Sequence, residues 1–167
     1  MWIEKDALAG VVADVTYEFD VPLMVSRGYA SLSFLYESAD DIARDGRPAH
    51  IYHLGDFDPS GVDAANKIEA TLREFAPAAE INFTRLAVLP EQITAWNLPT
   101  RPTKRTDSRS KGFGDVSVEL DAIDPRRLRE LVREALELHL PAEQFRVLKV
   151  VEESERQLLT AWAGGVA

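Results

Sequence analysis

The sequence predicts an α/β fold in which a mostly parallel sheet of about four strands is flanked by helices. Two observations lead to this prediction. Short apolar runs alternate with amphipathic segments of a dozen or more residues over residues 1–90. This alternation is typical of βαβ units, whose right-handed crossovers place helices on both faces of a sheet. Two further amphipathic segments follow in the last third of the chain and predict two C-terminal helices.

The predicted elements of the first half follow one another regularly. Strands are expected at residues 2–3, 21–25, 49–55 and 80–88, and helices at residues 7–19, 29–44 and 59–75. The third helix is the best patterned, because Val62, Ala65, Ile68 and Leu72 recur at helical spacing. A turn at residues 45–48, with Gly46 and Pro48, separates the second helix from the third strand.

After residue 90 the regular alternation of apolar runs and amphipathic segments ends. A long irregular connection with three prolines is expected over residues 90–114, and residues 99–114 form its basic loop. A brief edge strand is predicted at residues 116–120, and helices are predicted at residues 124–139 and 141–162. We therefore expect a single domain over residues 1–167, with a core at 1–90 and a C-terminal helical extension at 115–163. Because the first strand begins at the first residue, we also expect a fragment of a longer protein.

Composition limits the class of protein. The 167 residues are 46% hydrophobic and 28% charged, which suits one globular domain. The absence of cysteine excludes disulfides and thiolate metal sites, and the three histidines lack a zinc-ligand spacing. No apolar run approaches the ~20 residues of a membrane span, and no signal peptide is visible, so we expect a cytoplasmic protein. The net charge of −9 argues against non-specific coating of nucleic acid.

Three carboxylates mark the predicted carboxyl edge of the sheet. Asp56 and Asp58 follow the third strand, and residues two apart on a strand point the same way. Glu4 ends the first strand, and the carboxyl ends of parallel strands share one edge. Like charges aimed at one place are usually tolerated because a hard cation such as Mg²⁺ lies between them. The sequence therefore predicts a metal site at this edge.

These residues also carry a resemblance to a known family. The pair Glu4-Lys5 ends the first strand, Asp56-Phe-Asp-Pro-Ser-Gly61 follows the third, and Val25-Ser-Arg-Gly-Tyr29 forms a strand followed by a Gly-Tyr turn. Over about residues 1–90 the chain resembles the Toprim family, the catalytic module of topoisomerases, primases and some nucleases. It is most similar to the Toprim domain of type IIB topoisomerase A subunits and of related meiotic break-forming proteins.

The resemblance implies a Rossmann-like three-layer fold and Mg²⁺-dependent cleavage of nucleic-acid phosphodiesters, of a topoisomerase or nuclease type. Asp56 and Asp58 would bind Mg²⁺, or Mn²⁺ in its place, directly or through water. Glu4 would be a further metal ligand or the general acid and base at a 3′-oxygen. In the family's topoisomerases the nucleophilic tyrosine lies on a separate domain. Tyr17, Tyr29, Tyr36 and Tyr52 fall in predicted helices, strands or a turn, so a partner domain or subunit, or a metal-activated water, would supply the nucleophile.

Basic residues are the candidates for contacts with nucleic acid, with DNA as the first choice. Residues 101–111 hold five basic residues against one acid, a local net charge of +4 in an acidic chain. Together with two residues near the strand ends, the candidates are Lys5, Arg27, Arg101, Lys104, Arg105, Arg109 and Lys111. The alternative is that these side chains are solvated surface charges.

Simpler interpretations exist for several of these residues. Asp58 before Pro59 is also a good helix N-cap, and Glu4 can be a solvated residue. Glu119 and Asp121 can extend the metal site, although burial or helix capping explains them as well. His53 is expected to be a hydrogen-bonded core residue.

Two other functions fit the same pattern. One is a non-catalytic Toprim-like module that binds nucleic acid or protein. The other is a phosphatase-like enzyme with an aspartate nucleophile. That class usually carries a lid insertion, which this chain lacks.

Overall fold

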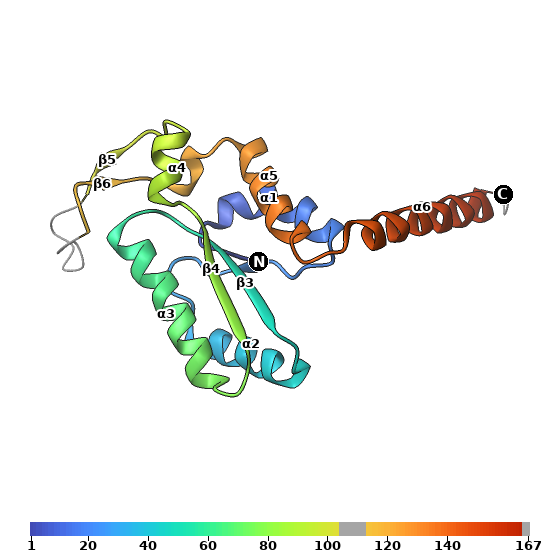
Figure 1. Ribbon diagram of the computed structural model, residues 1–167, viewed down its shortest axis with the longest axis horizontal. Coiled ribbons are helices and arrows are strands. Elements are labelled where there is room, and N and C mark those ends of the chain that lie inside the picture. Colours follow the sequence, from blue (N-terminus) through green and yellow to red (C-terminus); the bar gives the residue numbers. More distant parts are fainter. Residues whose placement is uncertain (104–112, 165–167) are drawn as a thin grey trace. The chain divides into compact units, whose positions relative to one another are not determined.

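The computed structural model describes residues 1–103 and 113–164, and the chain forms two compact units, Met1–Val132 and Arg133–Ala167. The first unit contains a four-stranded sheet made of β1 (Trp2–Ile3), β2 (Met24–Val25), β3 (Ala49–Leu54) and β4 (Ile81–Ala87). The strand order is β2-β1-β3-β4 and every pairing is parallel. The two long strands, β3 and β4, lie side by side in Figure 1. The α/β fold with a parallel sheet is thereby confirmed.

Three helices connect these strands: α1 (Asp6–Glu18), α2 (Leu32–Asp45) and α3 (Pro59–Phe75). The Ser31 hydroxyl caps α2 by accepting from Phe34 N at 3.3 Å, and α2 ends at Gly46 with φ of 71°. Helices α2 and α3 pack against one face of the sheet. The shared core consists of Trp2, Leu35, Ala39, Ile51, Ile68, Leu72, Ala76 and Ile81. Burying each large side chain stabilises the fold by roughly 1.5–3 kcal/mol.

The connection after β4 is more ordered than the sequence predicts. It contains α4 (Pro90–Ala95), β5 (Arg101–Pro102), β6 (Val116–Ser117) and the 3₁₀ turn η2 (Leu120–Ala122). The expectation of an irregular segment directly after β4 is wrong. Helix α4 forms because Pro90 suits its first turn and the Gln92 side chain accepts from Leu89 N at 2.9 Å. The predicted edge strand at residues 116–120 is present as the two-residue β6, antiparallel to β5.

Two helices close the chain, as predicted: α5 (Pro125–Glu137) and α6 (Ala142–Gly164). In α6 several large apolar side chains are exposed, among them Leu158, Leu159 and Trp162. Within the described residues, no helix combines the length and the apolar character needed to cross a bilayer.

Candidate functional site at the carboxyl edge of the sheet

The three predicted acids meet at the carboxyl edge of the sheet, because β1 and β3 are neighbours. Glu4 N donates to Leu54 O at 2.8 Å, which continues the pairing of β1 with β3 by one residue. Glu4 Oε2 accepts a hydrogen bond from Asp56 N at 3.1 Å. We call the group formed by Glu4, Asp56 and Asp58 the acid edge. The pairing of β1 with β3 brings Glu4 to Asp56, as the sequence predicts.

Two glycines allow this close approach. A Cβ on Gly55 would lie 2.7 Å from Glu4 Oε2, and a Cβ on Gly61 would lie 2.5 Å from the carbonyl oxygen of Asp56 and 3.1 Å from Glu4 Oε2. These separations are below van der Waals contact, so no side chain fits at either position without movement of the acid edge. The glycines of the motif therefore have a packing role around the Glu4 carboxylate.

Each acid uses one carboxylate oxygen to accept a backbone N–H. Asp58 Oδ1 caps α3 by accepting from Gly61 N at 2.7 Å, so the N-cap interpretation of Asp58 is confirmed. Asp56 Oδ1 accepts from Leu120 N at 2.8 Å. The cap does not occupy the whole Asp58 carboxylate, since its Oδ2 lies 3.5 Å from Arg101 Nη2. These anchors orient the acids and leave a second oxygen on each for other ligands.

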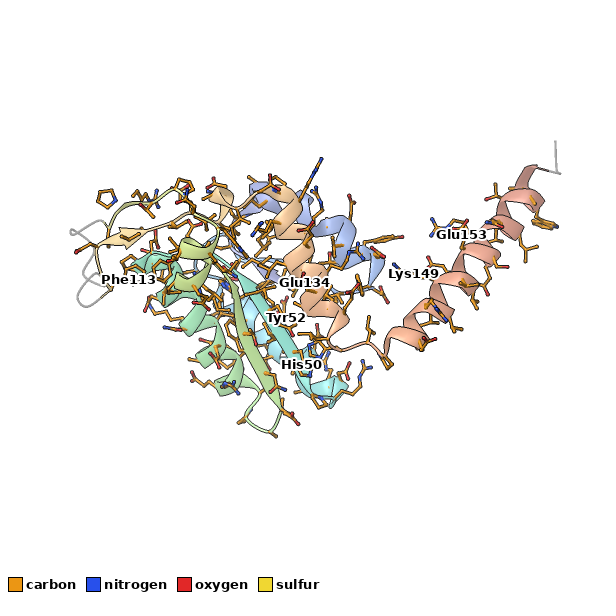
Figure 2. The ribbon with its side chains drawn as sticks, turned by 45° about the horizontal axis from the view of Figure 1, so that its top comes forward. His50, Tyr52, Phe113, Glu134, Lys149 and Glu153 are labelled. Carbon is orange, nitrogen blue, oxygen red and sulfur yellow. The ribbon has the colours of Figure 1, made fainter. Side chains whose placement is uncertain are left out.

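Residues about 60 positions further along the chain pair with the backbone of the acid edge. Phe57 N donates to Val118 O at 2.8 Å, and Val118 N donates back to Phe57 O at 2.9 Å. The Phe57 ring packs on the ring of Phe113, and the two ring centroids are 4.8 Å apart. Figure 2 labels Phe113. We call residues 116–122 the closing segment. Its docking places Glu119 and Asp121 beside the acid edge.

Two predicted phosphate-binding cations are paired with this closing segment. Lys5 Nζ lies 3.1 Å from Glu119 Oε2 and 2.5 Å from Asp121 Oδ2. Arg101 Nη1 pairs with Glu119 Oε1. Glu119 therefore bridges Lys5, which follows β1, and Arg101, which begins β5. A cavity of about 370 Å³ adjoins these ion pairs and is lined in part by Arg101, Glu119 and Asp121.

Arg85 on β4 is a site residue that the sequence analysis missed. Its guanidinium donates to the carbonyl oxygens of Gly55 (3.0 Å), Gly61 (3.2 Å) and Val88 (3.4 Å), and also to that of Asp56. These carbonyls lie on both sides of the turn that carries the two aspartates. Arg85 thus fixes the turn and places a positive charge behind the acid edge. Every residue has a backbone carbonyl, so partners of this kind cannot be recognised in a sequence. The one available signal was an arginine near the end of a predicted strand.

His53 lies in the core below this turn. Its ring is fully buried and stacks on Phe83, with centroids 6.0 Å apart. The predicted burial is confirmed, but the predicted hydrogen bond is absent, because neither ring nitrogen has a partner among the described residues. Burial, aided by the nearby Arg85 charge, lowers the pKa of His53 to about 3, so the ring is neutral.

The electrostatics of the acid edge show a surplus of negative charge. Burial raises the pKa of the Glu4 carboxyl; the hydrogen bond from Asp56 N opposes this, and the charges of Asp56 and Asp58 add to it. Burial also raises the pKa of Asp56, against the hydrogen bond from Leu120 N and the charge of Lys5. Counting the closing segment, five carboxylates (Glu4, Asp56, Asp58, Glu119 and Asp121) face three cations (Lys5, Arg85 and Arg101). Two negative charges remain, which is the charge that one divalent cation would neutralise.

The donor chemistry fits a hard cation. Carboxylate oxygens are the ligands that Mg²⁺ prefers, and in the described part of the chain Glu4 Oε1 and Asp56 Oδ2 accept no hydrogen bond. Among the described residues, however, no three carboxylate or imidazole groups are gathered closely enough to hold a metal ion as they stand. One oxygen of each acid is held by a backbone N–H, so side-chain movement would have to bring the other oxygens together for metal binding.

Of the remaining predicted site residues, Arg27 is described, and it does not contact the acid edge in the described structure. Arg27 pairs with Asp6 at 3.0 Å, and both side chains are exposed. Lys104, Arg105, Arg109 and Lys111 lie outside the described residues. Comparison of the chain with protein families, with curated proteins and with solved structures finds no match.

Proposed function

We propose that this chain is a Toprim-like catalytic domain that acts with Mg²⁺ on the phosphodiester bonds of nucleic acid, DNA in the first instance. The observation that carries the proposal is the contact between Glu4, at the end of β1, and the backbone of Asp56, at the end of β3. It brings three acids to the edge of a parallel sheet, which is where ligands of such folds bind. The resemblance of the surrounding motifs to the Toprim family supports the same function.

The proposed roles follow from the surroundings of each side chain. Asp56 and Asp58, each anchored through one oxygen, would hold Mg²⁺ with the other. The raised pKa of Glu4 suits it to accept and return the proton of a 3′-hydroxyl. Lys5 and Arg101 would hold backbone phosphates. The bound ion would supply charge stabilisation for the phosphoryl group and its leaving oxygen.

The nucleophile is proposed to come from a partner domain or subunit, or from water. Tyr17 and Tyr36 are exposed on α1 and α2, and Tyr52 lies within β3. The Tyr29 hydroxyl donates to Asp63 at 2.6 Å and belongs to the turn after β2. None of these four tyrosines is hydrogen-bonded to the acid edge in the described structure.

Metal binding is the first test. Asn at position 58 keeps an N-cap but removes the charge, so Asp58→Asn with Asp56→Asn should leave α3 intact. We expect Mn²⁺ affinity, measured by calorimetry, to fall at least tenfold. Asp40→Asn is the matched control, because Asp40 pairs with Arg44 on α2, outside the acid edge. Equal Mn²⁺ affinity in the wild type and the double variant would contradict the proposal.

A second candidate function is a non-catalytic module that binds nucleic acid or protein. One observation favours it: Lys5 and Arg101 already pair with protein carboxylates, and no metal cluster is formed among the described residues. Nicking of supercoiled plasmid with Mn²⁺ separates the two functions. Nicking that disappears in Glu4→Gln supports catalysis, whereas DNA binding without nicking supports the binding module.

A further inference from the structure

We propose that Lys5 and Arg101 form a phosphate-binding pair whose present partners, Glu119 and Asp121, are displaced by a backbone phosphate of the nucleic acid. This inference deepens the proposed function and rests on it. It adds that the closing segment occupies the phosphate site with its own carboxylates, so that these carboxylates compete with the substrate.

The geometry supports an exchange of partners. Glu119 offers one oxygen to Lys5 and the other to Arg101, as an oxygen pair of a phosphate would. The side chains of Lys5, Arg101, Glu119 and Asp121 are 31%, 41%, 35% and 48% exposed. Ion pairs with this exposure are weak, so a polyanion can displace them.

The position of the pair also supports the exchange. Lys5 follows directly after Glu4, and Arg101 lies 3.5 Å from Asp58 through its Nη2. A phosphate held by both cations would therefore lie next to the acid edge. The cavity of about 370 Å³ beside Arg101 offers room for the adjoining part of the strand.

The chemistry of the exchange is simple ion exchange without bond breaking. Two carboxylates leave the two cations, and one phosphodiester with a single negative charge takes their place. Asp58, whose Oδ2 lies 3.5 Å from Arg101 Nη2, balances the second positive charge. The freed Glu119 and Asp121 then face the solvent or the divalent cation. No proton needs to move.

The first experiment measures DNA binding by fluorescence anisotropy with a labelled duplex, in EDTA. Without divalent cations the result does not depend on the metal site, so its failure is distinguishable from failure of the proposed catalytic function. Lys5→Met with Arg101→Met should make the dependence of log affinity on log salt shallower by roughly 0.9 for each lost phosphate contact. An unchanged salt dependence, or no binding by the wild type at low salt, would overturn the proposal.

The second experiment removes the competing carboxylates. Glu119→Gln with Asp121→Asn should bind the duplex roughly three- to tenfold more tightly, with the salt dependence of the wild type. The matched control is Glu69→Gln with Glu152→Gln, which removes two carboxylates that pair with arginines elsewhere, at 2.8 and 2.9 Å. A gain as large in this control would show a general charge effect and would overturn the proposal.

A combined variant closes the test. In the Lys5→Met, Arg101→Met background, Glu119→Gln with Asp121→Asn should raise the affinity for the duplex no more than Glu69→Gln with Glu152→Gln does. A gain that persists there would refute the exchange. If the variant of both carboxylates does not fold, Asp121→Asn alone serves, since it is the most exposed of the four side chains and should still tighten binding.

Discussion

Replacement of Arg85 tests whether one guanidinium holds the turn of the acid edge. In Arg85→Met the carbonyl oxygens of Gly55, Asp56, Gly61 and Val88 lose the hydrogen bonds from the guanidinium, although Gly55 O still accepts from Val88 N at 2.7 Å. Hydrogen bonds to a charged group are worth about 1.5–3 kcal/mol each, or roughly 6–12 kcal/mol for all of them. Desolvation of the half-buried guanidinium offsets several kcal/mol of this. We expect the free energy of unfolding to fall by about 3 kcal/mol and Tm by about 6–12 °C.

The assay is urea unfolding followed by circular dichroism, together with Mn²⁺ titration of the folded variant. Arg73→Met is the matched control, because Arg73 pairs with Glu69 at 2.8 Å on the exposed face of α3. Its loss should cost less than about 0.5 kcal/mol. Arg85→Met should also weaken Mn²⁺ binding, since the turn that orients Asp56 loses its support. Equal effects of the two arginine variants on unfolding would refute the reasoning.

Three further predictions concern packing and pH. Gly61→Ala places a Cβ 2.5 Å from Asp56 O and should destabilise the fold by about 1–3 kcal/mol. Gly10→Ala, whose Cβ meets no atom within 4 Å, should stabilise α1 by about 0.5–1 kcal/mol. Urea unfolding compares the two variants, and equal effects on the free energy of unfolding would contradict the packing role of Gly61. Because folding raises the pKa of Glu4, the wild type loses stability as the pH rises through that raised value. Glu4→Gln should therefore be more stable than wild type at pH 7 and not below pH ~4, and an equal advantage at both pH values would count against it. His53 has its pKa lowered to about 3, so stability falls as the pH drops from 6.5 toward 3. His53→Leu should lose this dependence in chemical unfolding scans, while His50→Gln, at an exposed position of the same strand, should keep it.

The parts predicted correctly depend on regular periodicity. Residues 59–75 form a helix with the predicted bounds, because its apolar stripe and its Asp58-Pro59 start signal agree. The meeting of Glu4 with Asp56 follows from strand adjacency and needs no knowledge of loops. Both inferences use local pattern and the shared edge of parallel strands.

The parts that were missed depend on contacts between distant residues. Nothing local in Val116–Ser117 shows that the next residue pairs with Phe57. The six residues of α4 are too few for a periodic signal, and its cap comes from Gln92, within the helix itself. In the described part of the chain the His53 side chain has no hydrogen bond, even though a buried imidazole is expected to have one.

The docking of the closing segment has a consequence for the order of folding. The contacts Leu120–Asp56 and Lys5–Asp121 span 64 and 116 residues of chain, whereas β3 and β4 are neighbours in sequence as well as in space. Contacts of long sequence separation form late, because the entropy of closing their loops must be overcome first. During synthesis the sheet can therefore assemble before residue 121 has emerged. Until then Glu119 and Asp121 cannot hold Lys5 and Arg101 beside the acid edge. The acid edge would therefore reach its final charge balance only as the last helices are made.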